Sequence, residues 1–122
     1  MKQILSVLLA LLLLLTGCGG GGQKQEASYR QITQEEAKEM MDTQEVILLD
    51  VREQDEYDGG HIPGAVLLPV GSITSDTAAA VIPKTDSVVL VYCRSGNRSK
   101  TAAQALAELG YTGVYEFGGI KT

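Results

Sequence analysis

The sequence predicts an α/β domain in which a small, mostly parallel sheet is flanked by helices. Two continuous apolar runs, residues 46–51 and 87–92, are typical of strands that are buried on both faces. Residues 98–109 are rich in alanine and leucine and form the clearest predicted helix. Strands that alternate with helices favour parallel pairing through right-handed crossovers.

The domain opens with a short predicted edge strand at residues 29–32. The stretch Thr33-Gln-Glu-Glu36 is a capping box, in which the first hydroxyl and the last carboxylate satisfy free amides at a helix start. A helix is therefore predicted to about residue 41. Its expected inward-facing residues are Ala37, Met40 and Met41.

The middle of the chain alternates between strands and turns. After the strand at 46–51, residues 53–58 are polar and predict a turn or a short helix, and Pro63 and Gly64 predict a bend at 61–64. Residues 65–70 predict another strand, shortened by Pro69, which has no amide to donate. A weaker helix is predicted at 72–81. The helix at 98–109 stops at Gly110, and residues 114–117 predict the last strand.

The first 17 residues are predicted to be a signal peptide. Lys2 supplies a positive start, and residues 4–15 are apolar apart from one serine, which is too short a run for a comfortable membrane span. The ending Leu15-Thr-Gly-Cys18 resembles the lipobox of bacterial lipoproteins, which implies a lipidated Cys18 and an extracytoplasmic domain anchored to a bacterial membrane. A plain secretion signal and an uncleaved anchor helix are the alternatives.

Residues 18–27 predict a flexible glycine-rich tether, and residues 28–122 one domain. Cleavage before Cys18 removes Lys2, so the net charge changes from -5 to -6 (9 basic minus 15 acidic residues). An acidic excess argues against nucleic acid as a partner and against binding to anionic lipid. We therefore expect a monomer that meets the membrane through its lipid alone.

Cys93 ends a buried strand, and five residues, Arg94 to Arg98, join it to the next helix. A short glycine-containing loop before a helix can turn its amides inward, and these amides, the helix dipole and both arginines would stabilise a thiolate. The alternatives are a small buried hydrophobic cysteine and a phosphate-binding loop without chemistry. One domain cysteine and one histidine cannot fill a four-ligand metal site.

The loop Cys93-Arg-Ser-Gly-Asn-Arg-Ser99 resembles the active-site loop of rhodanese-like sulfurtransferases, of the form Cys-Arg-x-Gly-x-Arg. The stretches Asp50-Val-Arg-Glu53, Glu56-Tyr57 and Gly60-His-Ile-Pro-Gly-Ala65 resemble the other signature of that family, and Phe117-Gly-Gly119 its final strand and turn. The family usually adds a closing helix with a tryptophan. This sequence stops at Thr122 and has no tryptophan, so the expectation is either a truncated chain or a domain that lacks this last element.

The resemblance implies a three-layer fold and transfer of a sulfane sulfur without a cofactor. Cys93 would attack thiosulfate or a similar anionic donor, hold the sulfur as a persulfide, and pass it to cyanide or a thiol. The residues expected to bind the substrate are Arg94, Ser95, Gly96, Asn97 and Arg98. A thiol that stays protonated, or a sulfur sealed in the core, would contradict this reading.

Three further readings compete with sulfur transfer. Cysteine phosphatases and arsenate reductases also cradle a thiolate, but the phosphatase loop has five residues between cysteine and arginine, whereas four separate Cys93 from Arg98. No carboxylic acid lies in the loop to protonate a leaving alcohol. A non-catalytic binding module is the second alternative. Oxidation of Cys93 to a sulfenic acid or a mixed disulfide is the third.

Three signature residues are assigned structural roles near the site. Asp50 and Arg52 end a strand on the same side of the sheet as Cys93, and we expect them to form a buried or half-buried ion pair that fixes loops near the site. A contact of Arg52 with substrate is the alternative. His61 is the only histidine. Beside Ile-Pro-Gly it is expected to be a hydrogen-bonding residue of the fold rather than a partner of Cys93.

Overall fold

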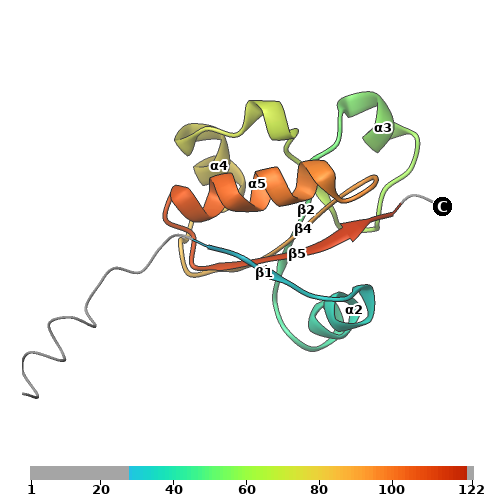
Figure 1. Ribbon diagram of the computed structural model, residues 1–122, viewed down its shortest axis with the longest axis horizontal. Coiled ribbons are helices and arrows are strands. Elements are labelled where there is room, and N and C mark those ends of the chain that lie inside the picture. The colour runs from blue at the N-terminus through green and yellow to red at the C-terminus, as the bar shows by residue number, and fades with distance from the viewer. Residues whose placement is uncertain (1–27, 121–122) are drawn as a thin grey trace, which may run out of the picture.

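The computed structural model describes residues 28–120, which form one α/β domain (Figure 1). Five parallel strands make a single sheet in the order β1-β5-β4-β2-β3. The strands are β1 (Arg30–Gln31), β2 (Ile47–Asp50), β3 (Val66–Leu67), β4 (Val88–Cys93) and β5 (Gly113–Gly119). The helices are α2 (Gln34–Thr43), α3 (Gln54–Asp58), α4 (Ser75–Val81) and α5 (Asn97–Glu108), with a 3-10 turn, η1, at Val70–Ser72.

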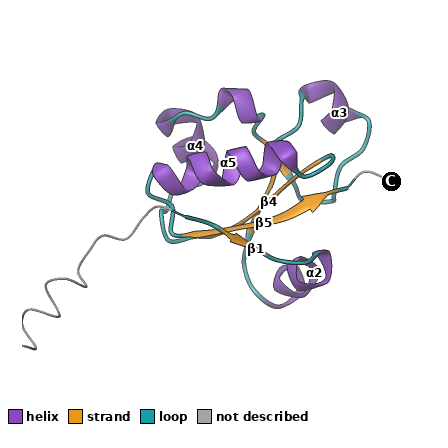
Figure 2. Cartoon of the chain, in the orientation of Figure 1, coloured by secondary structure: helices purple, strands orange, loops and turns teal. Residues whose placement is uncertain are grey.

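Helices cover both faces of the sheet, which gives the three layers expected of a rhodanese-like fold (Figure 2). Helices α4 and α5 lie on one face, over a core that includes Leu49, Val91 and Leu106. Helix α2 lies on the other face, where Ala37 packs with Leu90 and Phe117. Because both faces are covered, the central strands are apolar throughout, and this explains the two continuous apolar runs.

The capping box at Thr33 starts α2 where the sequence predicts. The Thr33 hydroxyl accepts from the Glu36 amide at 3.0 Å, and the Glu36 carboxylate accepts from the Thr33 amide at 2.8 Å. Ala37 is fully buried, and Met40 and Met41 pack against the same core cluster. The predicted inward face of this helix is therefore confirmed.

Two predicted boundaries are wrong. The strand expected at 65–70 pairs only at Val66–Leu67, because Pro69 donates no amide and the chain then turns into η1. The last strand runs further than 114–117 because its glycine end continues beside β4, where the Ile120 amide donates to the Cys93 carbonyl at 3.0 Å. This longer strand brings the Gly-Gly turn onto the loop that follows Cys93.

The predicted signal peptide, tether and lipidated Cys18 lie outside the described residues. Within residues 28–120 no helix is long and apolar enough to cross a membrane.

Candidate active site

Cys93 is the last residue of β4, and α5 begins four residues later. Gly96 caps α5 with φ +101°, a left-handed conformation that side-chain-bearing residues rarely adopt. This conformation turns the Gly96 amide toward the sulfur, so that it donates to Cys93 Sγ at 3.0 Å. The thiol in turn donates to Ser99 Oγ at 3.4 Å. The loop therefore holds the sulfur with an amide and a hydroxyl.

The surroundings of Cys93 favour its ionised form. Burial raises the pKa of the thiol, but the ionised sulfur would accept hydrogen bonds from the Ser99 side chain and from the amides of Ser99, Gly96 and Ser95, which together outweigh burial. The net pKa lies below the 9.0 of an ordinary thiol. The Ser99 hydroxyl is the largest of the lowering contributions, and the three amides add to it as in an anion-binding nest.

Cys93 has no exposed surface, in contrast to the open sulfur that the sequence reading requires. The Gly-Gly turn after β5 lies against the loop. A Cβ atom on Gly119 would stand 1.9 Å from the Arg94 carbonyl oxygen. The sulfur accepts from the Gly96 amide of its own loop, and the loop with the Gly-Gly turn against it (the cover) leaves the sulfur no exposed surface.

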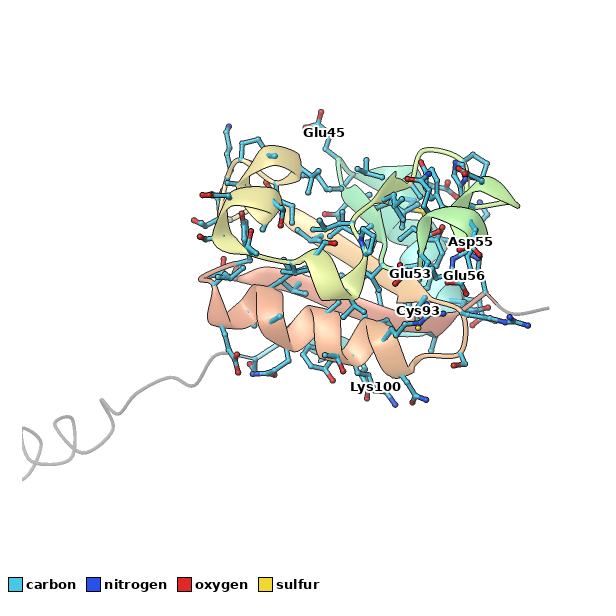
Figure 3. The ribbon with its side chains drawn as sticks, turned by 90° about the horizontal axis from the view of Figure 1, so that it is seen from above. Glu45, Glu53, Asp55, Glu56, Cys93 and Lys100 are labelled. Atoms are coloured by element: carbon cyan, nitrogen blue, oxygen red, sulfur yellow. The ribbon has the colours of Figure 1, made fainter. Side chains whose placement is uncertain are left out.

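Arg98 is paired with an acid and is not the free cation beside the sulfur that the sequence predicts. Its guanidinium donates to both carboxylate oxygens of Glu56, at 2.8 and 2.9 Å. These hydrogen bonds, together with one from the Glu53 amide, lower the pKa of Glu56 to about 2. Figure 3 shows Glu56 and Cys93 at the same end of the molecule, far from Glu45. One of the two predicted cations is thus already neutralised by an acid.

Three of the other four predicted loop residues lie at the surface. Arg94, Ser95 and Asn97 are exposed, and Gly96 is buried. Two hollows flank the loop. One, of about 280 Å³, is lined by Arg52, Asp55, Glu56, Gly59, Gly60, Arg94 and Ile120. The other, of about 450 Å³, includes Ser95, Gly96 and Lys100 in its lining. The first hollow is lined by two basic side chains, Arg52 and Arg94, and the second by Lys100.

Asp50 and Arg52 form a buried ion pair, with Arg52 Nη2 2.6 Å from Asp50 Oδ2. Arg52 also donates to the Gly60 carbonyl at 2.8 Å, and the Tyr92 hydroxyl donates to Asp50 at 2.8 Å. Burial raises the pKa of Asp50, but hydrogen bonds from Arg52 and Tyr92 hold it below its usual value. Burial likewise raises the pKa of Tyr92 to about 12. The pair fixes the loop after α3 beside the strand that carries Cys93.

His61 lies away from the sulfur. Its Nδ1 is 2.8 Å from the Tyr57 carbonyl, and its ring stacks on the Tyr57 ring with centroids 3.7 Å apart. The Tyr57 hydroxyl donates to the Ala65 carbonyl at 2.6 Å. These contacts tie α3 to the bend that follows it. In the described residues no cluster of acids, histidines and cysteines could hold a metal ion.

A family model described as "Rhodanese-like domain" matches residues 33–121. The chain belongs to the rhodanese-like family. The match spans both signature stretches and the Gly-Gly turn, and the five-stranded parallel sheet with helices on both faces is the fold of this family.

Relatives of this rhodanese-like chain are named as enzymes. It is 40% identical over 73 residues to thiosulfate sulfurtransferase PspE of Escherichia coli, covering 60% of this chain and 69% of PspE. It is 36% identical over 95 residues to thiosulfate sulfurtransferase GlpE of Coxiella burnetii, covering 77% and 86%. A human single-domain sulfurtransferase, TSTD1, has a similar structure, with a TM-score of 0.63, 26% identity and coverage of 75% and 91%. The chain is thus a rhodanese-type sulfurtransferase.

The sequence reading missed three residues of the site. Glu56 belongs to a recognised stretch, but nothing in its spacing pointed to Arg98. Ser99 lies in the recognised loop, but the loop pattern assigns it no role. Glu116 lies within the predicted last strand, and the pattern assigns it no role either. The available signal was its charge, since an acid inside a strand buried on both faces needs a partner.

Proposed function

We propose that this sulfurtransferase takes the outer sulfur of thiosulfate, holds it as a persulfide on Cys93, and passes it to a thiol or to cyanide. The observation that carries the proposal is the hydrogen bond from the Gly96 amide to Cys93 Sγ, at the centre of a loop whose amides favour an anion. The names of PspE and GlpE support thiosulfate as the donor.

In the first step the Cys93 thiolate attacks the outer sulfur. The new bond joins the two sulfurs, the sulfur–sulfur bond of thiosulfate breaks, and sulfite leaves with the bonding electrons. In the second step the acceptor's thiolate or cyanide attacks the terminal sulfur of the persulfide. Cys93 then leaves as a thiolate, which the loop amides stabilise.

Donor binding would use the loop and the exposed cation beside it. Thiosulfate carries two negative charges, and Arg94 is exposed at the hollow next to the loop. Because Arg98 is paired with Glu56, Arg94 supplies the free positive charge on that side. The cover over Cys93 must open for the donor to reach the sulfur, which makes opening part of each turnover.

The test uses purified full-length protein. Incubation with thiosulfate should add one sulfur atom to the intact mass, and later addition of cyanide should remove it and produce thiocyanate. An aryl phosphate serves as the contrasting substrate. Turnover of the phosphate without turnover of thiosulfate would favour the phosphatase reading and overturn the proposal.

We also propose that the protein is a monomer exported and anchored by a lipid on Cys18. The Leu-Thr-Gly-Cys ending of the apolar segment supports this proposal. The mass of protein extracted from membranes tests it. A chain that begins with Cys18 and carries added acyl mass is expected, and an unmodified Met1 would contradict it.

A further inference from the structure

A second carboxylate lies one hydroxyl away from the reactive sulfur. Glu116, on β5, is 1% exposed, and none of the ion pairs within residues 28–120 involves it. Its Oε2 accepts from Ser99 Oγ at 2.5 Å and from the Gly118 amide at 2.9 Å, and its Oε1 accepts from Gln31 at 3.1 Å. A buried acid that lacks a cation is costly, so its position calls for an explanation.

Ser99 connects this acid to Cys93. Besides Glu116, the Ser99 oxygen has the Gly96 carbonyl at 3.1 Å and Cys93 Sγ at 3.4 Å. A serine hydroxyl has one proton to donate. When Cys93 is a thiol, its proton points to Ser99 and Ser99 donates to the Glu116 carboxylate. The 2.5 Å separation is that of a charge-assisted hydrogen bond between two oxygens.

Ionisation of the sulfur reverses both hydrogen bonds. A thiolate needs Ser99 as a donor, so Ser99 can no longer donate to Glu116. Two oxygens 2.5 Å apart with no proton between them would repel each other. The arrangement is relieved when the thiol proton passes to Ser99 Oγ while the Ser99 proton passes to Glu116 Oε2. One S–H and one O–H bond break, two O–H bonds form, and no charge enters or leaves the buried cluster.

We propose that Glu116 is a positioning residue that exchanges a proton with Cys93 through Ser99 and holds that proton while the sulfur reacts. The exchange lets a fully buried thiol ionise without releasing its proton to solvent. It also explains ionisation without histidine, since His61 is engaged with Tyr57. That Glu116 holds the proton during sulfur transfer rests on the proposed function. The proton exchange between Cys93 and Glu116 does not.

The first test is the pH dependence of Cys93 alkylation by iodoacetamide, which needs no sulfur donor. In Glu116→Gln the amide oxygen still accepts from Ser99 and from Gly118 but takes up no proton. The inflection of the alkylation rate should therefore move upward by about one pH unit or more. Ser99→Ala should move it the same way, and the double variant should add little to either single change, since the residues act as one unit.

Asp42→Asn is the matched control, because it removes a carboxylate that is paired with Lys38 on the exposed face of α2 and does not contact Glu116, Ser99 or Cys93. Its inflection should equal that of the wild type. An unchanged inflection in Glu116→Gln would mean that the acid only supports the fold. A lower inflection would mean that Glu116 is a fixed negative charge that opposes the thiolate. Either result overturns the proposal.

A second measurement requires no change at Glu116. The infrared difference spectrum between wild type and Cys93→Ser at neutral pH should show the carbonyl band of a protonated carboxyl group in the wild type alone, because serine does not ionise there. Absence of this band overturns the proposal. If the band and the shift appear but thiosulfate adds no sulfur, the exchange stands and the proposed function fails. If thiosulfate adds sulfur but the band and the shift are absent, the proposed function stands and the exchange fails.

Discussion

The guanidinium of Arg98 is held by both carboxylate oxygens of Glu56, which joins the start of α5 to α3 at the rim of the sheet. The pair has a consequence for donor binding. It removes a positive charge that the loop sequence offers to an anion, and it leaves the exposed Arg94 as the free cation at the adjoining hollow. We therefore predict that Glu56, an acid outside the loop, affects the affinity for the anionic donor.

Glu56→Gln should strengthen thiosulfate binding. The substitution removes a negative charge near the loop and releases the guanidinium of Arg98, so the KM for thiosulfate should fall about threefold at low ionic strength and less at high salt. Steady-state kinetics at two salt concentrations measures the change. Asp58→Asn is the control, since Asp58 lies on the same helix and accepts from Gln54 instead. An equal fall in KM in both variants would mean that the effect comes from the lost negative charge in general and not from the pairing of Glu56 with Arg98.

Asp50→Asn should destabilise the fold by about 3 kcal/mol, because it leaves the buried Arg52 without its counter-charge. The pKa of Asp50 is lowered in the folded state. The contribution of the pair is therefore complete above its unfolded value of 3.8 and is lost as the pH falls through the folded value. Denaturant unfolding between neutral and acid pH measures both effects. Asp42→Asn, which breaks the exposed pair with Lys38, should change stability by less than about 0.5 kcal/mol.

His61→Gln should lower stability by about 1 kcal/mol and leave the turnover rate of each folded molecule nearly unchanged. The ring contacts only Tyr57 in the interactions described above, and neither of its nitrogens bonds to the sulfur. Thermal unfolding and kcat, corrected for the folded fraction, separate the two effects. A large loss of kcat at normal stability would contradict this prediction and would favour a catalytic pair of Cys93 and His61.

Gly119→Ala should disturb the cover over Cys93. A methyl group there would stand 1.9 Å from the Arg94 carbonyl oxygen, so the turn and the loop cannot keep their present approach. We expect a loss of about 2–3 kcal/mol in stability together with faster alkylation of Cys93 in the folded protein. Gly71→Ala is the matched control, because nothing lies within 4 Å of its added methyl group. If Gly119→Ala and wild type are alkylated at equal rates, the contact between Gly119 and Arg94 does not limit access to Cys93.

Local patterns predicted most of the fold, because apolar runs, capping boxes and turn residues act over a few neighbouring positions. The buried run at β4, the capping box at Thr33 and the stop at Gly110 all depend on such short spacings. The same reasoning identified Cys93 and its loop. What it predicted poorly was pairing between distant segments.

The contacts that shape the site connect residues far apart in the sequence. Arg98 and Glu56 are separated by 42 positions, and Ser99 and Glu116 by 17. A charge in the sequence shows that a partner is needed but not which one tertiary packing supplies. The burial of Cys93 was missed for a similar reason, since the glycine turn that approaches its loop comes from the far end of the chain.

The central claim is that Cys93 carries the transferred sulfur, and the intact mass of the full chain after exposure to thiosulfate tests it most directly. We predict one added sulfur atom on wild-type protein, its removal by cyanide, and no addition to Cys93→Ser. A wild-type mass that stays unchanged while thiocyanate still forms would contradict the account.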